Sequence, residues 1–197
     1  MIITIASFKG GVGKSTTALH LAAFCQTKAP TLLVDGDLNR SALQWASAGN
    51  LPFKVVDEKA AVKFARNYEH IIVDTPARPA PDDLKTLASG TDLLILPTSP
   101  DALAMGAMLQ MVDALQGLEA DYRILLTLIP PVPSKVGEEA RSSLERAGLP
   151  LFKTGIRRLA VFQKAALEGV SVNEVKGESY AGIAWRCYLE VGREIMP

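Results

Sequence analysis

Shortly after the apolar segment 1–5, the chain reads Lys9-Gly10-Gly11-Val12-Gly13-Lys14-Ser15-Thr16. The three glycines let the backbone curl around an anion without Cβ clashes. The N–H groups of such a turn and the N-terminus of a following helix converge on one point, where a polyphosphate can bind. In that arrangement Lys14 reaches the β- and γ-phosphates, and the Ser15 hydroxyl holds Mg²⁺. Residues 9–16 are therefore predicted to bind a nucleotide.

This loop departs from the common pattern G-x-x-x-x-G-K-[ST], because the first glycine would fall at Phe8. It follows K-G-G-x-G-K-[ST] instead, with a second lysine, Lys9, at its start. That variant is more specific than the common pattern. It resembles the deviant Walker A box of the ParA/MinD family of dimerising ATPases, and is closest to the small ParA-type partition and positioning ATPases, including those that position carboxysomes.

Other motifs along the chain support the same resemblance. Asp35-Gly36-Asp37 resembles the D-x-D switch box of the family, and Asp74-Thr75-Pro76 resembles its Walker B or switch II box. Segments 155–158, 161–165 and 169–172 resemble the late part of small ParA proteins. The resemblance covers essentially all 197 residues, so a single ParA-type domain over residues 1–197 is expected. It fails at Leu38-Asn39, where the family commonly has Pro-Gln.

Size and composition bound the possibilities. A chain of 197 residues fits one domain with a substantial core. Lys and Arg total 21 and Asp and Glu total 21, so any DNA binding must use a local patch rather than bulk charge. Cys25 and Cys187 lie far apart, which disfavours a disulfide framework or a cysteine metal site. No run of 18 apolar residues occurs, and a cytoplasmic location is expected.

Strand-like segments alternate with helical ones. Strands are predicted at 2–6, 31–34, 54–56, 70–73, 93–97 and 123–129. Helices are predicted at 14–27, 41–47, 58–67, 81–88, 101–116, 134–147, 159–169 and 180–195. Nearly unbroken apolar strands are typical of a parallel sheet covered on both faces. The prediction is an α/β fold of the P-loop NTPase class: a doubly wound, mostly parallel sheet flanked by helices, with all three nucleotide motifs just past the carboxyl ends of strands.

The resemblance also implies roles for the acidic residues. ATP and Mg²⁺ are the expected cofactors, with residues 9–16 as the binding loop and Ser15, Asp37 and Asp74 around the metal. Asp74 would contact the Mg²⁺ shell through water, and Asp37 would position the attacking water. The structural alternative is that Asp35 and Asp37 cap the following helix. The predicted catalytic set is Lys9, Lys14, Asp37 and Asp74, with slow ATP hydrolysis in the absence of a partner.

Lys9 has no obvious structural duty at the end of a strand. In the family, the lysine at this position reaches across a dimer interface to the nucleotide of the partner. The resemblance therefore implies an ATP-sandwich homodimer in which Lys9 contacts phosphate. A solvated lysine is the alternative.

The last part of the chain is the candidate DNA surface. Residues 153–197 contain seven basic and five acidic side chains, a balance that a mixed solvated surface also explains. The resemblance implies dimer-dependent, non-specific binding of double-stranded DNA through phosphate contacts. An arginine in this stretch could instead contact the nucleotide or the dimer partner. The candidate residues are Arg157, Arg158, Lys153, Lys164 and Arg186.

The implied function is an ATPase whose dimer binds DNA and partitions or positions a cargo: a plasmid, a chromosome or a protein assembly. A ParB-like or other cargo-linked protein would stimulate hydrolysis and release it. One alternative is a MinD-like membrane protein, but Glu190 and Glu194 balance Arg186 and Arg193 in the last predicted helix, which makes a membrane partner unlikely. The other is a P-loop metabolic enzyme of the dethiobiotin or cobyrinate synthase type. The sequence identifies neither the cargo nor the activating partner.

Overall fold

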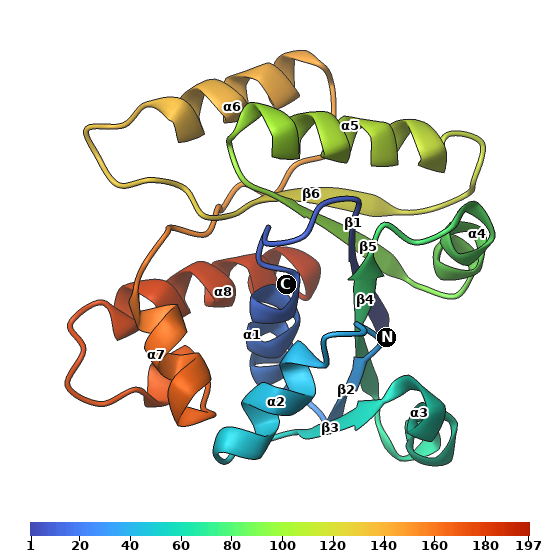
Figure 1. Cartoon of the computed structure of the whole chain (residues 1–197), viewed down its shortest axis with the longest axis vertical. Coiled ribbons are helices and arrows are strands. Elements are labelled where there is room, and N and C mark those ends of the chain that lie inside the picture. Colours follow the sequence, from blue (N-terminus) through green and yellow to red (C-terminus); the bar gives the residue numbers. More distant parts are fainter.

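The computed structural model describes residues 1–197 except for the side chain of Pro81, and its centre is a parallel β-sheet. Within these residues six strands are paired in the order β3-β2-β4-β1-β5-β6 (Figure 1). Every pair of neighbouring strands is parallel, which confirms the predicted sheet. The strands are β1 (Ile2–Ser7), β2 (Thr31–Asp35), β3 (Lys54–Asp57), β4 (His70–Ala77), β5 (Leu93–Thr98) and β6 (Tyr122–Leu126).

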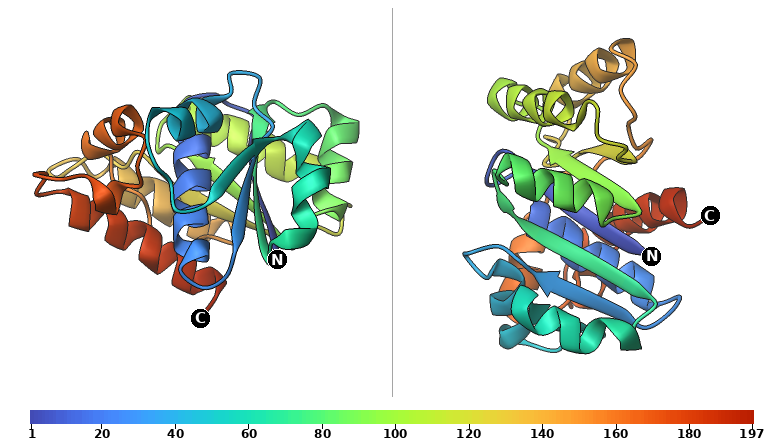
Figure 2. Two further views of the ribbon diagram at one scale, coloured as in Figure 1. Left: turned by 90° about the horizontal axis from the view of Figure 1, so that it is seen from below. Right: turned by 90° about the vertical axis from the view of Figure 1, so that its right-hand side faces the viewer.

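Helices cover both faces of this sheet (Figure 2), so the doubly wound architecture is confirmed. One face packs against α1 (Lys14–Gln26), α2 (Ser41–Ala48), α7 (Val161–Glu168) and α8 (Ala181–Ile195). The other face packs against α3 (Glu58–Phe64), α4 (Pro81–Ser89), α5 (Ala102–Leu115) and α6 (Val136–Arg146). Two short 3₁₀ turns, η1 (Ala65–Asn67) and η2 (Val172–Glu174), follow α3 and α7.

Helix α1 carries the end of the glycine loop into the centre of the molecule. Ten of its thirteen residues are buried, because the helix lies between the sheet and α8. Gly192 of α8 lets the two helices approach closely, since a Cβ there would collide with the Phe24 ring. The glycine loop is thus attached to one of the most deeply packed elements of the fold.

The strand order places the predicted motifs side by side. Strand β1 lies between β4 and β5, and the chain winds in opposite directions from this point, which is where open α/β sheets bind ligands. Asp74 of β4 is in register with Ile5 of β1 and with Asp35 of β2. The glycine loop and both acidic motifs therefore meet at one edge of the sheet.

The structure corrects several predicted boundaries. Strand β2 extends to Asp35, which stays in register with Asp57 and Asp74, so Asp35 lies within its strand. Asp74 also lies within its strand, because β4 stays paired with β1 as far as Ala77. Strand β6 ends at Leu126 rather than at 129, since Leu128 adopts a left-handed backbone (φ +51°) as the chain leaves the sheet. The helix expected over 58–67 divides into α3 and η1.

Among the described residues, no helix combines the length and the apolar character that crossing a membrane requires.

Candidate nucleotide site

The glycine loop has the backbone of an anion-binding turn. Gly11 and Gly13 have φ values of +77° and +84°, a left-handed conformation that a side chain would strain. Gly13 is the N-cap of α1, so the free N–H groups of the first helical turn face the loop. The Thr127 hydroxyl donates to the Val12 carbonyl at 2.8 Å and holds the loop against the end of β6. The shape of the loop is therefore set by its glycine backbone and by its contact with the end of β6.

Lys14 is the first residue of α1 and is almost completely buried. Its Nζ lies 3.8 Å from Oδ2 of Asp37, and Oδ1 of Asp37 accepts a hydrogen bond from the Asn39 N–H at 2.9 Å. The structure thus places Lys14, which is predicted to bind phosphate, beside Asp37, which is predicted to position the attacking water. In this state they neutralise each other.

Asp35 contacts the start of the following helix, which is the structural alternative that the sequence left open for Asp35 and Asp37. Its two carboxylate oxygens accept from the N–H groups of Asp37 (3.1 Å) and of Leu43 in the first turn of α2 (2.9 Å). The Arg40 guanidinium donates to its carbonyl at 2.9 Å. Asp35 therefore shapes the segment before α2 and leaves Asp37 as the carboxylate that faces Lys14.

Asp74 is fully buried, and neither of its carboxylate oxygens has a hydrogen-bond partner among the described residues. Burial raises its pKa to about 7; the nearby Ser15 hydroxyl and Lys14 ammonium act against this rise, whereas Asp35 and Asp37 add to it. A buried carboxylate without donors next to a serine hydroxyl fits the shell of a hydrated cation. Ser15 and Asp74 therefore fit the Mg²⁺ ion that the fold family implies.

A different metal site has no support. Among the described residues, no group of three or more His, Cys, Asp or Glu side chains is arranged to hold a metal ion. A nucleotide-bound Mg²⁺ does not need such a group, because phosphate oxygens and water supply most of its ligands.

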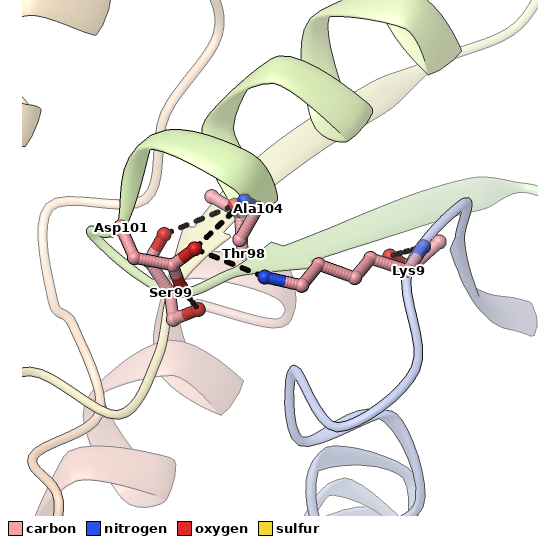
Figure 3. A network of polar contacts seen from close by, with 6 residues as sticks. Lys9, Thr98, Ser99, Asp101 and Ala104 are labelled. Atoms are coloured by element: carbon pink, nitrogen blue, oxygen red, sulfur yellow. Dashed lines mark hydrogen bonds and ion pairs between the residues drawn. The ribbon is translucent and has the colours of Figure 1, made fainter.

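Lys9 does have a partner within its own chain, contrary to the expectation from sequence. Its Nζ lies 2.9 Å from Oδ1 of Asp101, the N-cap of α5 (Figure 3). The same carboxylate accepts from the Ser99 hydroxyl and the Ala104 N–H, and these bonds and Lys9 hold the pKa of Asp101 well below its usual range. Asp101 was missed as a site residue, although an aspartate just before a helical pattern is an N-cap signal.

A cavity of about 890 Å³ lies over the glycine loop. Residues 9–13 and Thr16 form one wall, and residues 156–160 with α7 form another. Asp101, Thr127, Leu128 and Pro130 also line the cavity. The cavity thus combines the glycine loop with parts of the chain more than a hundred residues away.

Only two of the five candidate DNA-binding residues line the cavity. Arg157 and Arg158 are exposed and line the same cavity as the glycine loop. Lys164 on α7 is paired with Glu178 at 3.0 Å and lies 4.0 Å from Glu168, so its charge is compensated. Exposed Lys153 and Arg186 lie outside the cavity lining, the first in the segment after α6 and the second on α8.

The chain resembles known proteins in sequence. The model of the family described as the CobQ/CobB/MinD/ParA nucleotide binding domain matches residues 3–172. The chain is 34% identical to maintenance of carboxysome distribution protein A from Gloeobacter kilaueensis over 204 aligned positions, covering 98% of this chain and 93% of the relative. It is 27% identical to protein ParA from Rhizobium radiobacter, covering 90% of this chain and 87% of that protein.

A solved structure shares the whole fold. The ATP complex of a Cyanothece McdA variant superposes with a TM-score of 0.79 at 15% identity, covering 98% of this chain and 95% of that one. With a family model that spans most of the chain and a full-length relative above 30% identity, the protein is a member of the CobQ/CobB/MinD/ParA nucleotide-binding family.

Proposed function

We propose that the protein is an ATP-dependent, dimerising ParA-type ATPase that binds double-stranded DNA non-specifically and positions a cargo until a partner protein stimulates hydrolysis. The observation that carries the proposal is the charged group at the end of the glycine loop: Lys14 lies beside Asp37, and the nearby buried Asp74 has no hydrogen-bond partner among the described residues. Lys9 and the loop glycines line the adjoining cavity. The Gloeobacter relative is named for carboxysome distribution, which makes a protein assembly one cargo to test. In the cell we place the protein in the cytoplasm, on the nucleoid when it holds ATP.

In this proposal residues 9–16 bind the triphosphate. The loop N–H groups and Lys14 neutralise the β- and γ-phosphates, and Ser15 and Asp74 hold the hydrated Mg²⁺. When bound, that Mg²⁺ offsets negative charge on the phosphate oxygens during transfer. Asp37 lies beside Lys14, where it can accept a hydrogen bond from the attacking water. Hydrolysis is slow until a partner protein completes the site.

The proposed dimer depends on Lys9. For Lys9 to reach the nucleotide of a partner subunit, it must leave Asp101. The side chain is one-third exposed, and exposed ion pairs contribute only about 0–1 kcal/mol, so a phosphate can displace the carboxylate. Each subunit then completes the other's site, and tight ATP binding depends on dimerisation.

The proposed DNA surface consists of basic side chains in the last part of the chain. A dimer carries two copies of the candidate residues Arg157, Arg158, Lys153, Lys164 and Arg186, so together they bind DNA only in the ATP-bound pair. For Lys164 to contact a phosphate, it must leave Glu178. Arg157 and Arg158 line the nucleotide cavity and so connect the two activities. A ParB-like or other cargo-linked protein would act on this dimer.

An electrophoretic mobility shift with random-sequence duplex DNA tests the proposal. We expect a shift with a non-hydrolysable ATP analogue but not with ADP, weakened at higher salt and abolished by Lys9→Ala. The matched control is Lys59→Ala, an exposed lysine of α3 on the other face of the sheet, which should keep the shift.

Two results would contradict the proposal. A dimer that forms with ATP, seen by light scattering, but shifts no DNA would remove the DNA surface, and anionic vesicles would then test the MinD-like alternative. No ATP-dependent dimer at all would favour a P-loop metabolic enzyme of the dethiobiotin or cobyrinate synthase type.

A further inference from the structure

Two hydrogen bonds from the nucleotide site converge on the short segment 169–172, which links α7 to η2. The Trp45 indole N–H of α2 donates to the Val170 carbonyl at 2.9 Å. The Val172 N–H donates to Nε2 of His20 on α1 at 3.0 Å. Trp45 belongs to the helix that follows Asp37, and His20 belongs to the helix that begins at the glycine loop. Helix α2, which follows Asp37, and helix α1, which follows the glycine loop, are therefore both hydrogen-bonded to segment 169–172.

His20 makes a defined connection. Nε2 must accept from the Val172 N–H, so the ring proton is on Nδ1, which donates to the Thr16 carbonyl at 2.7 Å. The ring is fully buried and stacks on Tyr188 at 4.8 Å between ring centroids. Through this ring the segment 169–172 is attached to the first turn of α1, next to the phosphate-binding residues.

Helices α2 and α7 are also joined at their carboxyl ends. A Cβ at Gly49 would collide with the Glu168 carbonyl, and one at Gly169 would collide with the Gly49 N–H. Gly169 has φ +65° and is the C-cap of α7. The two backbones are thus in direct contact with no side chain between them, so α2 cannot slide without displacing α7.

A chain of contacts links Lys14 to the start of α2. Asp37 is the present partner of Lys14, and a phosphate entering the loop would compete for the same ammonium while repelling the carboxylate. Asp37 is bonded to Asp35, and Asp35 holds the first turn of α2 through Leu43. A displacement of Asp37 therefore acts on the end of α2 that is farther from Gly49.

We propose that Trp45 and His20 are positioning residues that connect nucleotide binding to the position of α7 through the segment 169–172. His20 keeps the segment attached to α1, while Trp45 and the Gly49–Gly169 contact make α7 follow α2. Helix α7 lines the nucleotide cavity and follows Arg157 and Arg158 in the chain. A shift of α7 would therefore move the segment that carries these arginines. This inference rests on the nucleotide role proposed above for Lys14 and Asp37.

Hydrogen exchange followed by mass spectrometry tests it on the full chain with saturating ATPγS. In the parent protein we expect exchange of the α7 amides to change by about fivefold on nucleotide binding. Trp45→Phe keeps an aromatic ring but removes the donor to Val170, and should reduce that change to less than about twofold at full occupancy. Trp185→Phe on α8 is the matched control and should behave as the parent does.

A fluorescent ATP analogue establishes occupancy for every variant. If the parent binds no nucleotide, the proposed function fails. If the parent binds nucleotide but its α7 exchange does not change, or if Trp45→Phe responds as the parent does, the function stands and this inference is overturned.

A second variant makes the test independent of how well Trp45→Phe folds. Asp37→Asn removes the charge that pairs with Lys14, so without nucleotide its α7 exchange should move toward the nucleotide-bound value. An α7 exchange rate identical to that of the nucleotide-free parent would also overturn the inference.

Discussion

At the scale of single residues, Asp74 destabilises the folded protein but has a proposed function in binding Mg²⁺. It is buried beside Asp35 and Asp37, its oxygens lack donors among the described residues, and its pKa is raised to about 7. An uncompensated carboxylate in such a place destabilises the free protein when it is charged. A hydrated Mg²⁺ would supply the missing hydrogen bonds and positive charge, so the cost is removed when the site is filled.

Asp74→Asn separates this metal role from nucleotide binding itself. We expect the affinity for a fluorescent ATP analogue to fall by about tenfold with Mg²⁺ and to change by less than about twofold in EDTA, because a neutral amide attracts a hydrated cation less strongly than a carboxylate does. The control is Asp57→Asn, which caps α3 at the end of another strand and should leave the Mg²⁺ dependence intact. An equal loss of affinity with and without Mg²⁺ would argue against a metal role for Asp74.

At the scale of elements, the packing of α8 on α1 supports the glycine loop. Helix α8 has an apolar stripe formed by Ala184, Tyr188 and Val191, and this stripe is buried in the core. It is therefore not exposed for contact with a membrane. The Tyr188 hydroxyl and the Thr17 hydroxyl of α1 lie 3.2 Å apart in a buried hydrogen bond. The helix that carries Lys14 is therefore fixed from the side opposite the sheet.

Gly192→Ala should weaken this support. The added methyl would collide with the Phe24 ring, and overpacking of this kind costs about 1–3 kcal/mol in the free energy of unfolding, measured by urea denaturation. Gly182→Ala on the same helix is the matched control, because a Cβ there has nothing within 4 Å and alanine is the better helix former. Equal stability of the two variants would mean that α8 shifts to admit the methyl, and that the contact is less tight than described.

At the scale of the whole molecule, stability should depend on the protonation of His20. Burial lowers its pKa from 6.5 to about 4, so its contribution is complete above pH 6.5 and is lost as the pH falls to 4. Protonation favours the unfolded chain over this window by about 3 kcal/mol. Asp74 acts in the opposite sense over an overlapping range, because its pKa is raised on folding. The informative quantity is therefore the difference between the parent and a variant.

His20→Gln provides that difference. The stability of the parent relative to His20→Gln, from urea denaturation at pH 7 and at pH 4.5, should shrink by about 2 kcal/mol at the lower pH. His70→Gln, at a half-buried position, should preserve most of the pH dependence of the parent. A gap between parent and His20→Gln that does not change with pH would mean that the buried ring is not kept neutral in the folded protein.

Local signals in the chain were enough for the fold class and for the phosphate-binding loop. Apolar runs and helical periodicity depend on neighbours a few residues away, and all six strands and eight helices were found within a few residues of their bounds. The same holds for the glycine loop, whose conformation at Gly11 and Gly13 follows from residue type. The six neighbouring strands are paired in parallel, as expected from their unbroken apolar character.

Long-range contacts had no such signal. Lys9 and Asp101 are 92 positions apart and pair because β1 and β5 are neighbours in the sheet. Trp45 reaches Val170 over 125 positions, and His20 reaches Val172 over 152. Asp74 likewise has no hydrogen-bond partner among the described residues because of the groups that surround it, and these are set by the register of β4 with β1 and β2. Hydrogen bonds and burial of this kind arise only when distant elements pack, so they follow from the tertiary structure and not from the order of residues.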